Sequence, residues 1–427
     1  MWLTSLKIKN LRVFKSAELI LAAGPSHGDL SNVTVFLGTN GSGKTSLLRA
    51  IALAALGAVL PSSGMRPYSL VRRVESGVRT CVIEGTFLPS RQDGFQKQIV
   101  SSIKLQNMRG FNDKFGAIKY PRAVEEQLWD DNSPACLVVG YGATRLVDSF
   151  GNGYSEATSR KSRSVRYQRV AGLFEEQVTL RSLSSWLPEY QNPGRRKQIA
   201  TLINKLLVDV GISISLIPVD NEYLFKVGDA TLPFAALSDG YRAYIGWISD
   251  LLFHICMGCP SGMRLDESQG IVLVDEIDLH LHPQWQRTVV TTLARTLPKM
   301  QFFFTTHSPL IAGTVPRDNI FVVSTQNNKA RLDPSTVDVY GWSVDQILNS
   351  KLFDETPARN PEAVKKIMQA SVKARSGNTA AAMELMQVLA DGLTADSRTP
   401  DHGRVRVTSD ELIKLGVLKR SSQSKNK

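Results

Sequence analysis

The sequence predicts an α/β fold with a mixed β-sheet around a phosphate-binding loop, and three observations support this class. A glycine-rich loop at residues 38–45 lies between a short apolar run and an alanine-rich segment. Two further apolar runs, at residues 271–274 and 302–304, end in side chains capable of acid–base chemistry. Alternating apolar and polar residues between positions 82 and 105 add antiparallel strands.

The elements of the first half follow in order from these patterns. Strands are expected at residues 6–11 and 33–37, and the second of these leads into the glycine-rich loop. Residues 46–60 form a helix that is buried on most of its surface, because alanine and leucine occur all around it. A buried strand is expected at residues 136–141. These elements make up a first predicted domain at residues 1–148.

The second half alternates helices and strands. Helices are expected within residues 175–208, at 240–255 and at 283–297, and a hairpin at 212–227. We assign residues 149–230 to an insertion, 231–340 to the C-terminal half of the α/β domain that residues 1–148 begin, and 341–427 to a helical C-terminal region. Asn360 and Asn378 are the expected helix caps in that last region.

Composition bounds the class of protein. The 427 residues are 42% hydrophobic, which excludes a wholly disordered chain and is enough for one large domain or a few smaller ones. No run approaches the roughly 18 apolar residues of a membrane helix, and the first residues lack the layout of a signal peptide. Four cysteines give no disulfide framework. We therefore expect a cytoplasmic protein with no membrane contact.

The charge balance favours an acidic partner. Lysine and arginine exceed aspartate and glutamate by 51 to 39, a net charge of +12. Part of this charge is expected in an exposed basic loop at residues 160–169 and in a basic tail from Arg404. These two segments either contact nucleic-acid phosphates or are only solvated surface. The five basic residues of the loop are Arg160, Lys161, Arg163, Arg166 and Arg169.

The glycine-rich loop has the complete G-x-x-x-x-G-K-[ST] pattern of a P-loop. Its glycines let backbone amides approach phosphates, Lys44 supplies a charge for the β- and γ-phosphates, and the Thr45 hydroxyl can ligate Mg²⁺. The helix that begins there points the positive end of its dipole at the same anion. The predicted nucleotide-binding residues of this loop are Gly38, Asn40, Gly41, Ser42, Gly43, Lys44, Thr45 and Ser46.

Two carboxylates follow the apolar run at residues 271–274. Phosphoryl transfer to water needs a carboxylate that holds the metal and a base that polarises the water. Asp275 fits the first role, together with Thr45, and Glu276 fits the second. The sequence therefore predicts hydrolysis of ATP with Mg²⁺ as cofactor.

Two more polar segments stand at the start of a predicted helix and at the end of a predicted strand. Ser238, Asp239 and Gly240 stand at the start of the helix expected at 240–255, where a plain N-cap also explains a serine. His307 follows the apolar run at 302–304, one strand beyond the two carboxylates.

Together these motifs resemble the ABC-class ATPase heads of the SMC, RecF and OLD group. The stretch from Asp275 to Pro283 separates them from transporter subunits. Within the group, the sequence is similar to the RecF/OLD-like ATPases of bacterial anti-phage operons, such as those of Septu and retron systems. The resemblance covers about residues 1–45 and 137–350, and it implies an ABC-type head with a mixed sheet and an antiparallel β subdomain.

The resemblance implies a homodimer that closes around nucleotide. Ser238, Asp239 and Gly240 are then the signature motif that completes the nucleotide site of the other subunit. Asp278 and His280 belong to a loop that joins the two subunits, which we prefer to a metal site at His280 and His282. His307 is implied to contact the γ-phosphate as a catalytic residue beside Glu276.

Two departures and one weaker assignment accompany this resemblance. Residues 139–145 contain no glutamine where related heads carry one, and Arg145 stands there instead, either near the nucleotide or partner subunit or as a surface arginine. Arg12 stands where related heads place a basic residue near the nucleotide. The insertion has no heptad repeat, which excludes a cohesin-like rod.

The leading functional hypothesis is an ATPase that regulates a separately encoded effector nuclease in anti-phage defence. Only about 80 residues follow Leu348, too few for the nuclease domain of OLD proteins. The alternative is a RecF-like DNA-binding ATPase in repair or recombination, with residues 160–169 and the tail on phosphates. The ATPase subunit of a membrane transporter is a third class.

Overall fold

A computed structural model describes residues 1–22, 30–74, 77–108, 110–147, 164–188, 190–215, 223–326 and 329–353, and isolated residues between 365 and 386. The chain divides into two compact units, Met1–Ala358 and Arg359–Lys427. Of the second unit, only single helical positions such as Lys365 are described. The predicted caps at Asn360 and Asn378 and the basic tail lie outside the described residues.

A six-stranded mixed sheet forms the centre of the first unit, in the order β16-β15-β3-β14-β13-β7. All neighbours are parallel except β15 and β16. The sheet is therefore the α/β core that the sequence predicts. Its strands are β3 (Val33–Leu37), β7 (Val138–Tyr141), β13 (Gly270–Val274), β14 (Met300–Thr306), β15 (Ile320–Gln326) and β16 (Lys329–Pro334).

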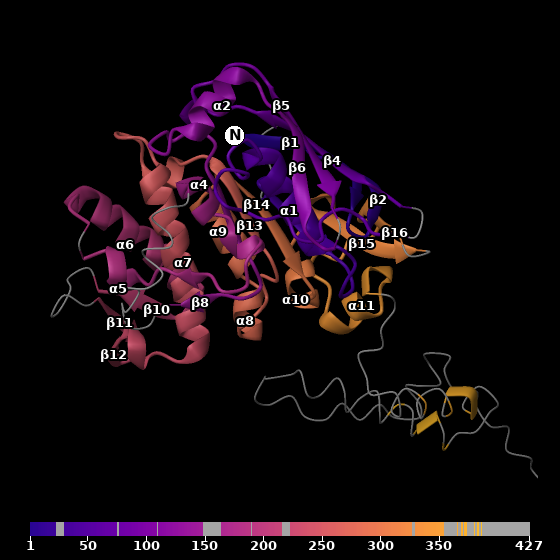
Figure 1. Ribbon diagram of the computed structural model, residues 1–427. Helices are drawn as coiled ribbons and strands as arrows, with labels where there is room; N and C mark the ends of the chain where they lie inside the picture. Colours follow the sequence, from indigo (N-terminus) through magenta and orange to yellow (C-terminus); the bar gives the residue numbers. More distant parts are fainter. Residues whose placement is uncertain are drawn as a thin grey trace, which may run out of the picture. The chain divides into compact units, whose positions relative to one another are not determined.

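Helix α1 (Lys44–Leu56) packs between the central sheet and a five-stranded antiparallel sheet with the order β2-β1-β4-β5-β6 (Figure 1). Leu47, Leu48, Ile51 and Leu53 of α1 are fully buried between the two sheets, which explains its alanine-rich sequence. The strands are β1 (Trp2–Leu11), β2 (Phe14–Ile20), β4 (Thr80–Leu88), β5 (Ile99–Asn107) and β6 (Asp113–Lys119).

Helices pack on the opposite face of the central sheet and form a second core. The long amphipathic helix α7 (Asp239–Gly258) packs beside α6 (Pro193–Leu207), and α9 (Val289–Thr296) lies next to α6 (Figure 1). Trp247, Leu251 and Phe302 belong to this core. A small antiparallel sheet adjoins the helices, made of β10 (Ile212–Ile214), β11 (Leu224–Val227) and β12 (Ala230–Pro233).

Short elements connect these layers. They are α2 (Arg122–Trp129), β8 (Leu146–Val147), α4 (Val165–Gln168), β9 (Thr179–Leu180), α5 (Leu183–Trp186), α8 (Pro283–Gln286), α10 (Pro309–Ala312) and α11 (Val344–Leu348). Among the described helices, none is both long and apolar enough to cross a bilayer.

The prediction that residues 160–169 form an exposed basic loop is wrong for Arg166 and Arg169. Arg166 of α4 and Arg169 at the C-terminal end of this helix are only 2% and 5% exposed. Arg166 donates hydrogen bonds to main-chain oxygens that include Leu128 O at 2.8 Å and Ala135 O at 2.7 Å. Arg160, Lys161 and Arg163 lie outside the described residues. Two of the five charges assigned to a nucleic-acid surface are therefore not on the surface.

Candidate active site

Three parallel strands bring the predicted motifs to one edge of the central sheet. Thr306 of β14 pairs with Leu37 of β3, and Val274 of β13 pairs with Phe304 of β14. The strands thus end at nearly the same level. The P-loop after β3, the carboxylates after β13 and His307 after β14 meet there, although they are far apart in the sequence.

The P-loop requires its glycines for steric reasons. Gly41 and Gly43 have φ angles of 76° and 113°, which a residue with a Cβ rarely adopts. A Cβ on Gly43 would also lie 2.7 Å from the side chains of Val13 and Phe14. At Gly38, a Cβ would lie 2.2 Å from the carbonyl oxygen of Val323. The loop is therefore held between β2 and β15 in a shape that leads directly into the N-terminus of α1.

The Lys44 ammonium is buried beneath the loop, where it is held by three contacts. Its Nζ donates to the carbonyl oxygens of Gly38 at 2.8 Å and Thr39 at 3.0 Å, and lies 2.7 Å from Nε2 of His307. Burial lowers the pKa of His307, and the positive charge of Lys44 lowers it further. A neutral His307 can accept the third hydrogen bond of the ammonium.

A hydrogen-bonded chain links the P-loop to the two carboxylates. The Thr45 hydroxyl donates to Asp275 Oδ2 at 2.7 Å, and the Thr305 hydroxyl donates to Asp275 Oδ1 at 2.5 Å. The Thr305 oxygen in turn accepts the backbone N–H of Glu276 at 2.7 Å. Sequence reasoning missed Thr305, although the Thr305-Thr306 pair directly before His307 marks a polar strand end.

Glu276 adopts a left-handed backbone conformation, with φ at 47°. Two groups hold it there: the Thr305 hydroxyl on its N–H, and the Arg145 guanidinium, which donates to the carbonyl oxygen of Glu276 at 2.7 Å. The same guanidinium nitrogen donates to the carbonyl oxygen of Asp275. Backbone strain of this kind is common at functional sites.

The structure places Arg145 outside the lining of the nucleotide cavity. Arg145 is buried, its guanidinium carbon lies 5.9 Å from the ring centre of Trp247, and burial lowers its pKa to about 10. It is neither a surface arginine nor part of the nucleotide cavity, since its donors bind the main chain behind the carboxylates. Arg145 is therefore a positioning residue for Asp275 and Glu276.

A cavity of about 160 Å³ opens at this edge of the sheet. Most of the predicted nucleotide-binding residues line it, including the exposed Arg12, whereas Gly38, Ser42 and Arg145 do not. Ser42 is buried, and its hydroxyl has no hydrogen-bond partner among the described residues. The lining is Arg12, Val13, Asn40, Gly41, Gly43, Lys44, Thr45, Ser46, Asp275, Glu276 and His307.

The signature residues do not reach this cavity within one chain. Ser238 and Asp239 are exposed at the start of α7, and the Ser238 side chain makes no capping hydrogen bond. The start of α7 follows β12, away from α1 (Figure 1). Gly240 faces the predicted dimer loop instead, because a Cβ there would lie 3.6 Å from the carbonyl oxygen of His280.

The dimer loop itself is anchored to the active site. Asp278 accepts a hydrogen bond from the Thr306 hydroxyl at 2.5 Å, one residue before His307. His280 is exposed, with φ at 64°. The ring of Tyr241 packs on Trp285 with centroids 4.9 Å apart, so the signature segment and the loop form one continuous surface.

Two family profiles match the chain. The profile "AAA domain, putative AbiEii toxin, Type IV TA system" matches residues 145–313, and the profile "AAA domain" matches residues 5–116. The first match contains the signature segment, the two carboxylates and His307, and the second contains the P-loop.

Two relatives are named after the Septu and retron systems of bacteria. The Septu protein PtuA of Bacillus mycoides (strain KBAB4) is 27% identical over 320 residues, which are 75% of this chain and 40% of the relative. The "Retron Vc95 probable ATPase" of Vibrio cholerae serotype O1 biovar El Tor is 32% identical over 171 residues, 40% of this chain and 33% of the relative. The chain thus spans less than half the length of each.

Among solved structures, an SMC head bound to the C-winged helix domain of ScpA is 16% identical. The match covers 78% of this chain and 97% of that chain, with a TM-score of 0.48. The fold assignment depends on the strand order and site geometry of this chain. Those features give the chain the α/β P-loop NTPase fold, and the two profiles and the sequence relatives show that it is similar to AAA domains and to the Septu and retron ATPases.

Proposed function

We propose that this chain binds and hydrolyses ATP with Mg²⁺, dimerises around the nucleotide, and regulates a separately encoded effector nuclease in anti-phage defence. The observation that carries the hydrolytic role is the hydrogen-bonded chain from Thr45 through Asp275 and Thr305 to Glu276. It connects the phosphate-binding loop to the proposed base.

The P-loop and Lys44 hold the triphosphate. In the structure, the Lys44 ammonium bonds the loop's own carbonyl oxygens at Gly38 and Thr39. ATP supplies phosphate oxygens that compete for these donors, aided by the N-terminus of α1. Lys44 and His307 are in contact, so an oxygen that binds Lys44 also comes within reach of the His307 ring. This arrangement supports a γ-phosphate contact for His307.

Thr45 and Asp275 fit a magnesium site. A hydroxyl and a carboxylate 2.7 Å apart beside the P-loop are hard oxygen donors of the kind that Mg²⁺ prefers. The ion, when bound, neutralises charge on the phosphates. Thr305 keeps Asp275 oriented toward Thr45 by occupying its other carboxylate oxygen. Glu276, half-buried at the cavity wall, is left to polarise water.

A dimer completes the site in this proposal. Ser238 and Asp239 are exposed and absent from the nucleotide cavity of their own chain. With His280, they lie on the one surface formed by the signature segment and the dimer loop. A second copy that presents this surface to the cavity would bring the Ser238 hydroxyl and the N-terminus of α7 to the γ-phosphate.

The defence role rests on the similarity to the Septu and retron proteins. The separate effector nuclease rests on the resemblance described under Sequence analysis. The alternative, a RecF-like DNA-binding ATPase, has lost support from Arg166 and Arg169, which are buried. Its remaining charges fall on residues 160–163 and on the tail, outside the described residues. We therefore place the effector-regulating ATPase first.

Two experiments test this function. The first measures phosphate release from ATP with Mg²⁺, with EDTA, and for Lys44→Ala, which should bind ATP at least about tenfold more weakly. Hydrolysis that persists in EDTA would contradict the magnesium assignment. The second purifies the native complex and identifies its components by mass spectrometry. An accompanying nuclease supports the effector role, whereas recovery of DNA without any partner protein favours the RecF-like alternative.

A further inference from the structure

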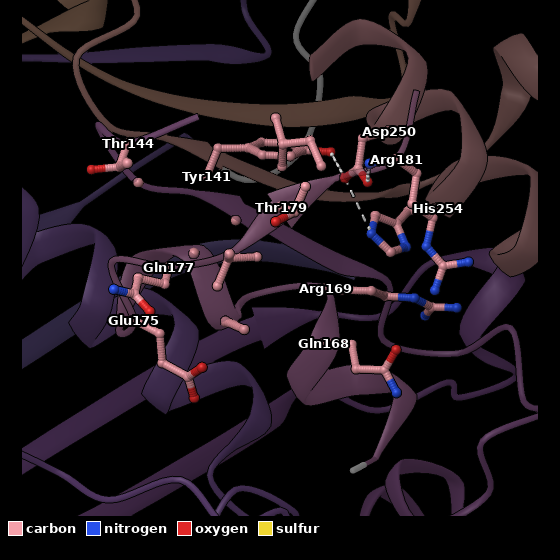
Figure 2. A pocket seen from close by; sticks show the side chains of 16 residues that line it. Tyr141, Thr144, Gln168, Arg169, Glu175, Gln177, Thr179, Arg181, Asp250 and His254 are labelled. Atoms are coloured by element: carbon pink, nitrogen blue, oxygen red, sulfur yellow. Dashed lines mark hydrogen bonds and ion pairs between the residues drawn. The ribbon is translucent and has the colours of Figure 1, made fainter. Parts of the chain in front are cut away.

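A second cavity, of about 260 Å³, lies next to the turn that follows β7 (Figure 2). Its walls come from the end of β7 and the turn after it, the segments from Gln168 to Gly172 and from Glu175 to Arg181, and helix α7. It shares no lining residue with the nucleotide cavity. None of the motifs that predict ATP hydrolysis accounts for it.

One end of this cavity is cationic. The side chains of Arg169 and Arg181 converge there beside His254 (Figure 2). Arg169 is 5% exposed, and among the described residues its Nε atom has no hydrogen-bond partner. Burial lowers the pKa of Arg169 to about 10, which still leaves it protonated at neutral pH. A buried guanidinium N–H without an acceptor is costly, unless a ligand supplies one.

Arg166 shows how this fold satisfies a buried arginine that has only a structural role. It stands three residues earlier in the same short segment and is 2% exposed. Its three nitrogens donate to six main-chain oxygens, on residues 127, 128, 130, 133, 135 and 136. Among the described residues, the Nε atom of Arg169 has no acceptor of this kind, although the backbone N–H of Gly140 donates to the main-chain oxygen of Arg169 at 2.7 Å.

The nearby carboxylate does not neutralise Arg169. Asp250 accepts hydrogen bonds from the Tyr141 hydroxyl at 3.0 Å and from the Arg181 backbone N–H at 2.9 Å. Its Oδ2 also lies 3.3 Å from His254 Nε2. Both carboxylate oxygens are therefore engaged within this cluster, and the positive charge of Arg169 remains directed at the cavity.

The other end of the cavity is polar and lacks this charge. Thr144, Glu175 and Gln177 lie there, apart from the two arginines (Figure 2). A ligand that fits both ends has an anionic group for the guanidinium groups and a hydrogen-bonding body. Arginine binds phosphate groups through paired N–H donors. The volume of this cavity is small for a ligand site, which favours a small ligand. We propose that this cavity binds a small phosphate monoester through Arg169 and Arg181.

The cavity adjoins the machinery that positions the carboxylates. The main-chain oxygen of Tyr141 accepts the N–H of Asp275 at 2.9 Å, and Arg145 follows in the same turn. The turn has little room to move, because a Cβ on Gly142 would lie 2.1 Å from the carbonyl oxygen of Gly172. A ligand that braces this wall therefore acts on the backbone that holds Asp275 and Glu276.

Calorimetric titration at fixed ionic strength tests the proposal, with inorganic phosphate and adenosine 5′-monophosphate as probes. The full chain and its Lys44→Ala variant should bind at least one probe with a Kd below about 1 mM. The Arg169→Gln variant should bind it at least about tenfold more weakly. Arg122→Gln, whose side chain is 91% exposed, is the matched control and should bind normally. Stronger binding of the nucleotide than of phosphate would support a ligand with an organic body, and equal binding an inorganic phosphate site.

Two results would overturn the proposal. One is the absence of binding of either probe to the parental chain. The other is binding that disappears in Lys44→Ala but persists in Arg169→Gln, which would place the probe at the P-loop. If Arg169→Gln does not fold, Arg181→Gln takes its place, because the Arg181 guanidinium packs 4.2 Å above the Phe253 ring at the same end.

Discussion

Thr305 joins the two acidic residues of the active site through a single hydroxyl. It donates to Asp275 and accepts from the N–H of Glu276, so one oxygen orients the proposed metal ligand and fixes the backbone of the proposed base. Serine can preserve both bonds, whereas valine can preserve neither. The position of Glu276 therefore depends on a residue that makes no contribution to charge.

For the proposed base itself, we expect Glu276→Gln to retain ATP binding and lose hydrolysis. The amide keeps the shape of the carboxylate but cannot act as a base, so the turnover rate should fall about 100- to 10,000-fold. Phosphate release and nucleotide binding should be measured side by side. Glu126→Gln, at an exposed glutamate of α2, is the control. Turnover at the parental rate in Glu276→Gln would show that another group acts as the base.

At the scale of elements, the turn after β7 supports the carboxylates after β13. We expect Arg145→Lys to lower the turnover rate about 10- to 100-fold, because one ammonium cannot reproduce the planar guanidinium that bonds the carbonyl oxygens of Asp275 and Glu276. ATP affinity should change less than about threefold, since Arg145 does not line the nucleotide cavity. A large loss of affinity with unchanged turnover would restore the direct nucleotide contact.

Helix α4 contributes to the stability of the fold through Arg166. We expect Arg166→Gln to lower the free energy of unfolding by about 3 kcal/mol, because the shorter amide leaves most of its six carbonyl acceptors without this donor, and four of these hydrogen bonds are buried. Urea denaturation of the purified chain measures the change. Arg122→Gln again serves as the exposed control. A change below about 0.5 kcal/mol would indicate that water replaces the guanidinium.

For the whole molecule, the proposed dimer makes a prediction about mixed subunits. Ser238→Arg should bind nucleotide but fail to hydrolyse it, because the arginine would meet the γ-phosphate site of the partner subunit. Mixing this chain with Lys44→Ala should recover up to about half of the parental activity per dimer, since one composite site is intact and the other carries both changes. If heterodimers form but hydrolyse no ATP at any mixing ratio, the nucleotide sites are not shared between the two subunits.

The central sheet and the motifs at its edge could be predicted from the sequence. Buried parallel strands are continuous apolar runs, and the residues at their ends are fixed by local pattern, as at Lys44 and Asp275. The structure confirms the α/β class, the strands at 33–37 and 136–141, and the long helix from Asp239. The antiparallel strands around residues 82–105 are confirmed as well.

Contacts between distant segments could not be predicted in the same way. Arginine is typical of protein surfaces and ligand sites. Only the folded structure shows that Arg145 and Arg166 are buried and donate to main-chain carbonyl oxygens. The basic loop was therefore misassigned at Arg166 and Arg169. Strands β2, β15 and β16 were also missed, because short or mixed runs carry a weak periodic signal.

The position of β3 has a consequence for biogenesis. Both hydrogen-bonding partners of this strand, β14 and β15, begin more than 260 residues after it starts at Val33, at Met300 and Ile320. During synthesis, the apolar strand therefore leaves the ribosome long before either neighbour exists, with two unpaired edges that invite aggregation. Such distant pairing also slows folding. Expression of the N-terminal half alone should give an insoluble product, and co-expression of the two halves is the way to rescue it.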